Sequence, residues 1–237
     1  MAQLLSKKLP VHFWNEDRGL TSIFILLCIS NFLVVPFFNQ RLTILILVRI
    51  SWFLILVAGI TTMARNRNQM RRFSVIPILL VVVSALQIIL DLKVLAYIDF
   101  MVELSVFALL IGMVMIKVFE GGSVTIHRVI GSIVVYMLIG NVWAIMFQFI
   151  HTMIPGSLQV PELYTETGVP NSVFLYFSFT TLTTTGYGEI LPVHAIARTL
   201  VIIEQLIGVL YPVVLIGRLV SLVAGKPETS EGENTIE

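Results

Sequence analysis

Five consecutive residues in the C-terminal third of the chain have the types and spacing needed to hold a dehydrated cation: Thr184, Thr185, Gly186, Tyr187 and Gly188. Each can present a backbone carbonyl oxygen, and rings of such oxygens can replace the water around an ion. The two glycines tolerate backbone dihedral angles that strain other residues. The chemistry that this run predicts is cation coordination along a narrow axis.

A short apolar segment leads into this run. Residues 173–182 are mostly apolar, but a helix of that length is too short to cross a bilayer. Asn171 and Ser172, directly before it, are residue types that cap helix N-termini. Irregular backbone is tolerated at membrane depth only where it is buried in protein or lines a water-filled cavity. We therefore expect a re-entrant helix that holds the five residues inside a membrane.

The composition supports a membrane location. Apolar residues make up 57% of the 237 residues and charged residues only 12%, against roughly a quarter charged in soluble domains. The formal charge of +1 gives no electrostatic case for binding nucleic acid, and the single cysteine excludes an intrachain disulfide. The sequence predicts an all-α membrane protein with six transmembrane helices and one re-entrant helix. Apolar runs of about 20 residues, enough to span a bilayer, lie at about 20–38, 42–63, 74–91, 98–118, 128–150 and 197–222.

The distribution of Lys and Arg predicts the orientation of these helices. Because cytoplasmic loops are enriched in Lys and Arg, both termini are expected in the cytoplasm of a plasma or inner membrane, with the Pro- and Gly-rich residues 151–170 as an exposed outer loop. No small-residue cleavage site follows the first apolar run, so we expect it to remain as an anchor. The opposite side carries Arg41, Lys93 and Arg198. The predicted cytoplasmic side carries Lys7, Lys8, Arg18, Arg65, Arg67, Arg71, Arg72, Lys117, Arg128, Arg218 and Lys226.

The predicted domain organisation follows from the spans and from breaks between them. Paired glycines in the linker mark a helix break, and the polar, acidic C-terminal end is typical of a disordered tail. The expected parts are a cytoplasmic N-terminus at 1–19, a peripheral four-helix transmembrane domain at 20–118, a linker at 119–127, a pore domain at 128–222 and a cytoplasmic tail at 223–237.

The Thr-Thr-Gly-Tyr-Gly run resembles the selectivity filter of tetrameric potassium channels, and the resemblance covers about residues 130–222. It implies successive K⁺ sites formed by the carbonyls of Thr184, Thr185, Gly186 and Tyr187, with the Thr184 hydroxyl. Potassium would be the permeant ion, with no other cofactor. The chain has one such run, and one run cannot close a ring of carbonyls. A homotetramer is therefore expected.

Five residues in and around the run depart from the common pattern of that family. Thr185 stands where Val is usual, and Glu189 stands where Asp is usual. Thr180 stands where several members carry a buried acid, and Tyr176 and Phe177 stand where tryptophans often brace the filter. We expect a hydrogen bond from Tyr176 to Glu189 to provide the missing support.

The last apolar span carries the residues expected to open and close a pore. Gly208 matches the hinge glycine of the family's inner helix. Pro212 removes a helical hydrogen bond, and the loss of that bond allows a kink. Val209, Pro212, Ile216 and Val220 recur at helical spacing and are expected to line the cavity and inner mouth. Ile216 or Val220 is predicted to form the gate.

Charged residues inside the predicted spans need partners, because a membrane-embedded charge is costly. Arg49 and Glu103 lie at similar depths, which predicts an ion pair, with Asp99 or Asp91 as alternative partners of Arg49. For Glu204 we expect a bond to the back of a neighbouring subunit's re-entrant helix. The fourth span lacks arginines at every third position, so it is not a conventional voltage sensor.

A basic cluster follows the second span. Its expected role is to fix the orientation of the chain. A second hypothesis is that it binds anionic lipid headgroups, since each basic side chain near such a surface contributes about 1 kcal/mol. The cluster consists of Arg65, Arg67, Arg71 and Arg72.

Together these features predict a potassium-selective channel that conducts passively and is not conventionally voltage-gated. The alternatives are a non-selective cation channel, or a non-conducting or transport-associated potassium subunit. An enzyme is not expected, because the chain has no His-Glu-x-x-His motif, phosphate-binding glycine loop or nucleophile elbow. The stimulus that opens the channel is left open by the sequence.

Overall fold

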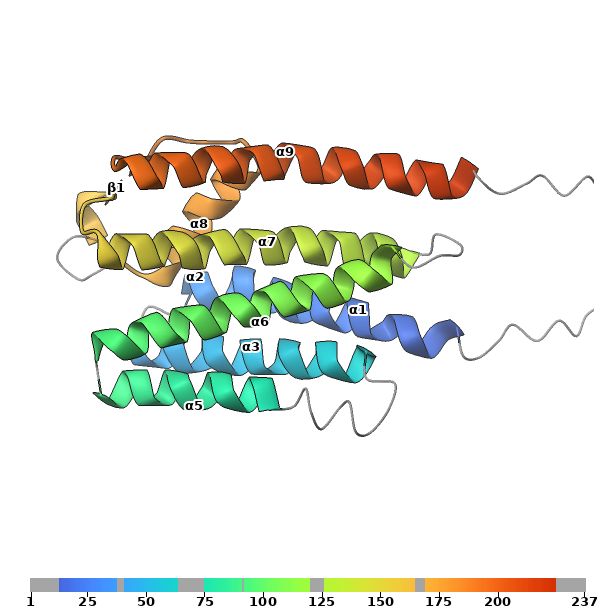
Figure 1. Ribbon diagram of the computed structural model, residues 1–237, viewed down its shortest axis with the longest axis horizontal. Coiled ribbons are helices and arrows are strands. Elements are labelled where there is room, and N and C mark those ends of the chain that lie inside the picture. The colour runs from blue at the N-terminus through green and yellow to red at the C-terminus, as the bar shows by residue number, and fades with distance from the viewer. Residues whose placement is uncertain are drawn as a thin grey trace, which may run out of the picture.

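The computed structural model describes residues 13–37, 41–63, 75–90, 92–119, 126–164 and 169–224, and most of these are helical (Figure 1). The elements in chain order are α1 (Phe13–Cys28), the π-helical turn η1 (Ile29–Val34), α2 (Val35–Phe37), α3 (Arg41–Met63), α5 (Val75–Leu90), α6 (Lys93–Phe119), α7 (Ile126–Met153), β1 (Leu158–Gln159), the 3₁₀ turn η2 (Glu162–Tyr164), α8 (Asn171–Leu182), β2 (Leu191–Pro192) and α9 (Ala195–Ala224).

Three of the described helices are long and apolar enough to cross a membrane. They contain the segments Val94–Phe119, Ile126–Met153 and Ala195–Arg218. At 1.5 Å per residue, each exceeds the hydrocarbon thickness of about 30 Å. The other predicted spans contain shorter described apolar stretches, at Gly19–Val34, Arg49–Gly59 and Ile78–Gln87. The prediction of a membrane protein is therefore supported, while the number of six spans stays a prediction.

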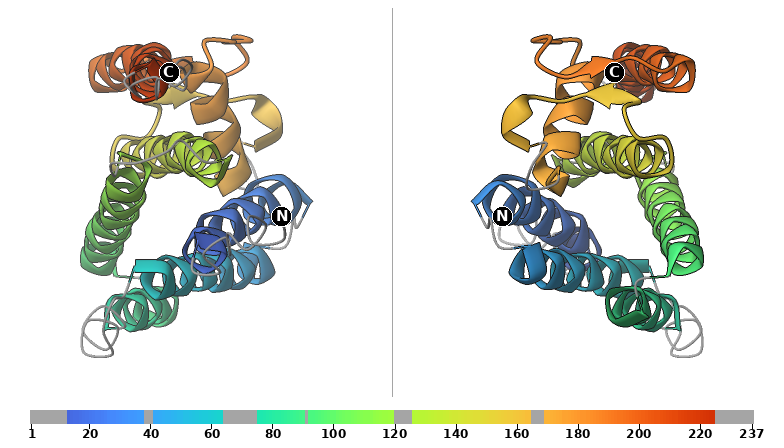
Figure 2. Two further views of the ribbon diagram at one scale, coloured as in Figure 1. Left: turned by 90° about the vertical axis from the view of Figure 1, so that its right-hand side faces the viewer. Right: turned by 90° about the vertical axis from the view of Figure 1, so that its left-hand side faces the viewer.

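The long helices lie side by side with their axes running in similar directions (Figure 1). The first described residue of α1 and the last of α9 lie at the same end of the molecule. The short helix α8 and the strands lie toward the opposite end (Figure 1). Figure 2 shows the same arrangement end on, with α8 beside α7 and α9 and the helices of the N-terminal half grouped on the other side of α7.

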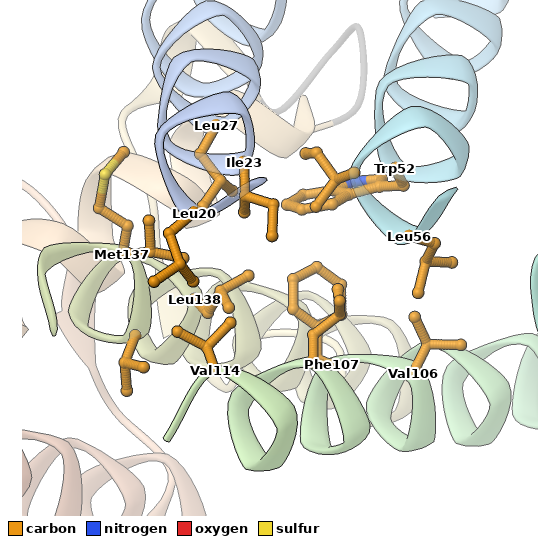
Figure 3. Close-up of a cluster of buried hydrophobic side chains, with 14 of the residues drawn as sticks. Leu20, Ile23, Leu27, Trp52, Leu56, Val106, Phe107, Val114, Met137 and Leu138 are labelled. Carbon is orange, nitrogen blue, oxygen red and sulfur yellow. The ribbon is translucent and has the colours of Figure 1, made fainter. Parts of the chain in front are cut away.

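The N-terminal helices pack against α7 of their own chain. α1 and α6 both contact α7, and their buried side chains form one cluster with Trp52 of α3 (Figure 3). The backbone of α7 approaches closely at Gly131, where an added Cβ would lie 2.8 Å from Val118 and 3.2 Å from Leu20. Small residues allow such close helix contacts in membranes. Helices α1 and α6 are thus fixed to α7.

A second buried cluster surrounds α8, which packs against both α7 and α9. Its N-terminus differs from the prediction. Pro170 is the N-cap residue and no side chain caps the helix, so the expected caps from Asn171 and Ser172 are wrong. The reason is local: Pro170 has an extended backbone, and its carbonyl accepts the first turn's hydrogen bond from Val173. The helix therefore already includes Asn171.

The predicted exposed outer loop is also partly buried. Ser157 and Leu158 are buried, and β1 pairs antiparallel with β2 through Leu158 with Pro192 and Gln159 with Leu191. The Ser157 carbonyl accepts hydrogen bonds from the backbone N–H groups of residues 193 and 194. This pairing ties the segment after α7 to the segment that follows the five-residue run.

Element ends extend beyond the predicted spans. α6 begins at Lys93, α9 reaches Ala224 and α1 begins at Phe13, because helical hydrogen bonding continues past the apolar window that a bilayer requires. The basic cluster defined above lies outside the described residues, as do Asp91 and residues 120–125 and 225–237.

Candidate functional site

The five-residue run connects α8 to β2 with an alternating backbone. Thr184, Gly186 and Gly188 have φ angles of 59°, 53° and 82°, whereas Thr185 and Tyr187 between them are not in the left-handed region. Alternation of left- and right-handed residues turns successive N–H groups toward one side. The carbonyls of the same peptide groups then lie on the opposite side. A row of carbonyls on one side is the geometry that coordinates a cation.

The N–H side of this run is bonded to the C-terminal end of α8. Thr184 N–H donates to the Thr181 carbonyl at 2.9 Å. The N–H groups of Thr185 and Gly186 both donate to the Thr180 carbonyl, at 2.8 and 3.0 Å. Thr180 thus supports the run through its backbone, while its hydroxyl donates to Phe177 within the helix. The carbonyls of the run are left free to face an ion.

Side chains around the run supply two further contacts. The Thr185 hydroxyl lies 2.9 Å from the Thr183 hydroxyl, which itself donates to the Phe179 carbonyl. Tyr176 donates its hydroxyl to Glu189 at 3.2 Å, so the predicted hydrogen bond is present. The Tyr176 ring also lies parallel to that of Tyr187, with centroids 6.4 Å apart. The Thr185 hydroxyl and the Glu189 carboxylate, which both depart from the common pattern, therefore each have a hydrogen-bond partner.

The run is exposed in a single chain. Every residue from 183 to 189 is exposed, and Tyr187 is 69% exposed. Polar backbone at membrane depth must be covered by protein or face water. One chain therefore leaves this site incomplete.

Helix α9 contacts the C-terminal end of α8 at Gly208. A Cβ at Gly208 would lie 1.9 Å from the Leu182 carbonyl oxygen. That oxygen also accepts a hydrogen bond from Tyr136 of α7 at 3.1 Å. Only glycine permits this approach, so Gly208 has a packing role that sequence reasoning missed. α9 is helical throughout, including Gly208 and Pro212.

The other residues predicted to line the pore lie on exposed parts of α9. Val209, Ile216 and Val220 are exposed and Pro212 is half-buried in the single chain. These side chains are therefore free to face a shared axis, and their roles in lining and gating stay predictions.

Glu204 is buried within its own chain, with 0% of the residue exposed. Its Oε1 lies 2.6 Å from the hydroxyl of Ser178 on α8. The prediction of a bond to a re-entrant helix was right in kind, but the helix belongs to the same chain. The sequence predicted that Glu204 has a polar partner, because a charge inside a membrane span is costly. Nothing in the sequence singled out Ser178 as that partner.

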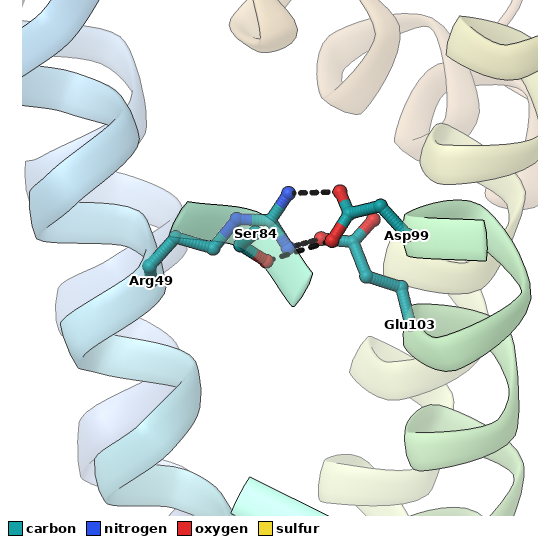
Figure 4. Close-up of polar contacts among 4 residues, drawn as sticks. All are labelled: Arg49, Ser84, Asp99 and Glu103. Carbon is teal, nitrogen blue, oxygen red and sulfur yellow. Dashed lines mark hydrogen bonds and ion pairs between the residues drawn. The ribbon is translucent and has the colours of Figure 1, made fainter. Parts of the chain in front are cut away.

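Three charged residues of the N-terminal helices form one cluster (Figure 4). Arg49 is paired with Glu103 and with Asp99, the latter at 2.6 Å. Ser84 of α5 donates to the other oxygen of Asp99 at 2.7 Å. The predicted Arg49–Glu103 pair is confirmed, and Asp99 joins it instead of replacing it. The guanidinium fork bonds two carboxylates at once, which suits its planar set of donors.

The part of the chain that contains the run is similar to a known family of proteins. Residues 129–224 match a family model described as ion channel. This part of the chain is therefore similar to the ion channel family. The matched ion channel domain includes α8 and α9 and all but the first turn of α7, while the N-terminal helices lie outside the match. Comparison with curated proteins gave no match.

Proposed function

We propose that the protein is a potassium-selective channel that conducts K⁺ passively across a cell membrane. The observation that carries the proposal is the alternating backbone of residues 184–188, in which the N–H groups of residues 184–186 bond to α8. In this proposal K⁺ binds between the carbonyls of Thr184, Thr185, Gly186 and Tyr187, and the Thr184 hydroxyl completes the innermost site.

Four copies of the chain form the channel in this proposal. The exposed run and the exposed apolar side chains of α9 support it, because both need covering in a membrane. Helix α8 directs its C-terminal end, which carries a partial negative charge, toward the end of the run at Thr184. A cation entering the shared cavity is stabilised there.

The N-terminal helices serve as a peripheral domain without steep voltage sensing. Support comes from the cluster around Arg49, in which this arginine of α3 is bonded to two acids and so is held in place. Both termini are proposed to be cytoplasmic, with the basic cluster binding anionic lipid headgroups there.

A non-selective cation channel is the second candidate. It is favoured by the unusual support of the run, in which Thr183 and Thr185 share a hydroxyl contact and Glu189 is bonded to Tyr176. Support of this kind could hold the carbonyls at a spacing that also accepts Na⁺. The two candidates differ in the ion flux that they predict.

The proposal is tested with purified protein in liposomes that carry either a K⁺ or a Na⁺ gradient. K⁺ efflux well above that of empty liposomes, with little Na⁺ flux, is expected. Gly186→Ala should abolish K⁺ flux, because its φ of 53° is strained for alanine. Gly112→Ala is the matched control: both glycines have open space around an added Cβ, but Gly112 lies in a regular helix. Equal K⁺ and Na⁺ flux would favour the second candidate, and absence of both would contradict conduction.

A further inference from the structure

The hydroxyl of Ser178 lies between two oxygens deep in the ion channel domain. It is 2.7 Å from the Gly140 carbonyl of α7 and 2.6 Å from Oε1 of Glu204 on α9. Ser178 and Glu204 are each 0% exposed. Both distances are those of good O–H···O hydrogen bonds. One side chain of α8 therefore links both of the long helices that flank it.

The number of hydrogens decides how these bonds are made. A serine hydroxyl has one hydrogen, and a backbone carbonyl can only accept. If Ser178 donates to Gly140, the short contact with Glu204 needs a hydrogen from the carboxyl group. If Ser178 donates to Glu204 instead, its oxygen faces the Gly140 carbonyl with no hydrogen between them. Both contacts are hydrogen bonds only when Glu204 carries a proton.

The second carboxyl oxygen supports the same assignment. Oε2 of Glu204 is buried and has no hydrogen-bond partner among the described residues. An ionised carboxylate would place part of its charge on this oxygen, and a buried charge without a donor is far more costly than a neutral carbonyl oxygen. A protonated group with its hydrogen on Oε1 avoids that cost.

No basic side chain in the described parts of the neighbouring helices approaches Glu204. On α9, Arg198 and Arg218 lie about 9 and 21 Å away along the helix axis, and Arg198 donates to the Pro192 carbonyl. The basic residues of α7 lie about 16 Å or more from Gly140 along its axis. These are His127, Arg128 and His151.

The remaining titratable groups on these elements are phenols, which bring no positive charge. Tyr136 of α7 is close enough to interact electrostatically with Glu204 and donates to Leu182. Tyr176 of α8 is bonded to Glu189, and Tyr211 of α9 donates to the Ser132 carbonyl of α7. The surroundings therefore favour a neutral Glu204.

Glu204 lies one helical turn before Gly208, the residue that rests on the Leu182 carbonyl. The two contacts hold the same face of α9 against α8. Since α8 ends directly at the run and bonds its N–H groups, a movement of α9 at this point would be transmitted to the carbonyls.

We propose that Glu204 is a neutral carboxylic acid whose O–H group donates a hydrogen bond to Ser178 and so holds α9 against α8 in the conducting form. After removal of that proton at alkaline pH, the single Ser178 hydrogen can no longer serve both Gly140 and Glu204, and a charge is left buried beside α8. Conduction then falls. The effect on conduction rests on the proposed channel function, whereas the protonation of Glu204 does not.

Infrared spectroscopy of the purified protein in lipid tests the protonation directly. At neutral pH the wild-type protein should show the C=O stretching band of a buried protonated carboxyl group, shifted in D₂O. The band should be absent in Glu204→Gln and retained in Glu162→Gln, which removes an exposed carboxylate of η2. A spectrum in which Glu204→Gln removes no such band at neutral pH overturns the proposal.

K⁺ flux from liposomes across a pH series tests the effect on conduction. Wild-type flux should fall by up to about tenfold as alkaline pH removes the proton, since a tenfold change is the upper end of what loss of one hydrogen bond between neutral groups produces. Glu204→Gln cannot ionise but can still donate to Ser178, so it should retain neutral-pH flux and lack the alkaline fall. Ser178→Ala should lower flux even at neutral pH.

The two measurements separate the two claims. A carboxyl band together with no K⁺ flux in wild-type protein at any pH contradicts the channel function and leaves the protonation supported. A carboxyl band together with flux that falls equally in wild type and Glu204→Gln overturns the role of Glu204 in conduction.

Discussion

At the scale of single residues, the ion site depends on which groups hold the backbone of residues 184–188. The N–H groups of residues 184–186 bond to α8, and the far end is held by Tyr176 through Glu189. In the family that the run resembles, this place is commonly supported by an acid and tryptophans. Here a phenol hydroxyl and a glutamate, one methylene longer than aspartate, make the contact. The support is therefore a single hydrogen bond at the outer end of the run.

Removal of that hydrogen bond should destabilise the run without removing any proposed ion site. Tyr176→Phe is expected to destabilise the run only modestly, because the bond is exposed to solvent, and to accelerate the decay of K⁺ current in planar bilayers. Tyr97→Phe removes a phenol hydroxyl from α6 and should leave the decay unchanged. If current decay is the same in Tyr176→Phe and wild type, the bond does not support the run.

At the scale of elements, α7 connects the two halves of the molecule. α1 and α6 pack on one side of it, and α8 and α9 pack on the other. The charged cluster around Arg49 joins α3, α5 and α6 across the interior of the N-terminal helices (Figure 4). Inside a membrane this cluster replaces the hydrophobic driving force that holds helices together in water.

Removing the positive charge of the cluster alone should lower stability more than neutralising all three of its charged residues. Arg49→Gln leaves Asp99 and Glu103 without their cation, and loss of one partner of a buried ion pair costs about 3–5 kcal/mol. We expect a large fall in the thermal unfolding midpoint of the detergent-solubilised protein.

The matched control neutralises every member together: Arg49→Gln, Asp99→Asn and Glu103→Gln. Replacing a whole buried ion cluster is often close to neutral, so this triple variant should recover most of the lost stability. A triple variant less stable than Arg49→Gln alone would contradict the paired arrangement.

At the scale of the whole molecule, the structure places the described ends of α1 and α9 together and the run near the opposite end (Figure 1). An even number of membrane crossings accounts for this arrangement. The row of carbonyls and the apolar face of α9 are both exposed in one chain. An assembly of four copies around the carbonyls would cover both.

The sequence was informative where chemistry is local and incomplete where it depends on how helices rotate against each other. The Thr-Thr-Gly-Tyr-Gly run and the Tyr176–Glu189 bond lie within a short segment, so residue types and spacing were enough to predict them. The sequence named Asp99 only as an alternative to Glu103 and assigned Glu204 a partner helix in another subunit. That Asp99 and Glu103 bond Arg49 together, and that Glu204 meets Ser178 of its own chain, depends on which helix faces meet. Spacing along one helix carries no information about this.

The most direct test of potassium-selective conduction is the reversal potential of the channel in a planar bilayer with K⁺ on one side and Na⁺ on the other. We predict a reversal potential shifted strongly toward the K⁺ equilibrium potential, because carbonyls held by α8 replace the hydration shell of K⁺. A reversal potential near zero under these conditions, which means equal permeability to K⁺ and Na⁺, would contradict this account.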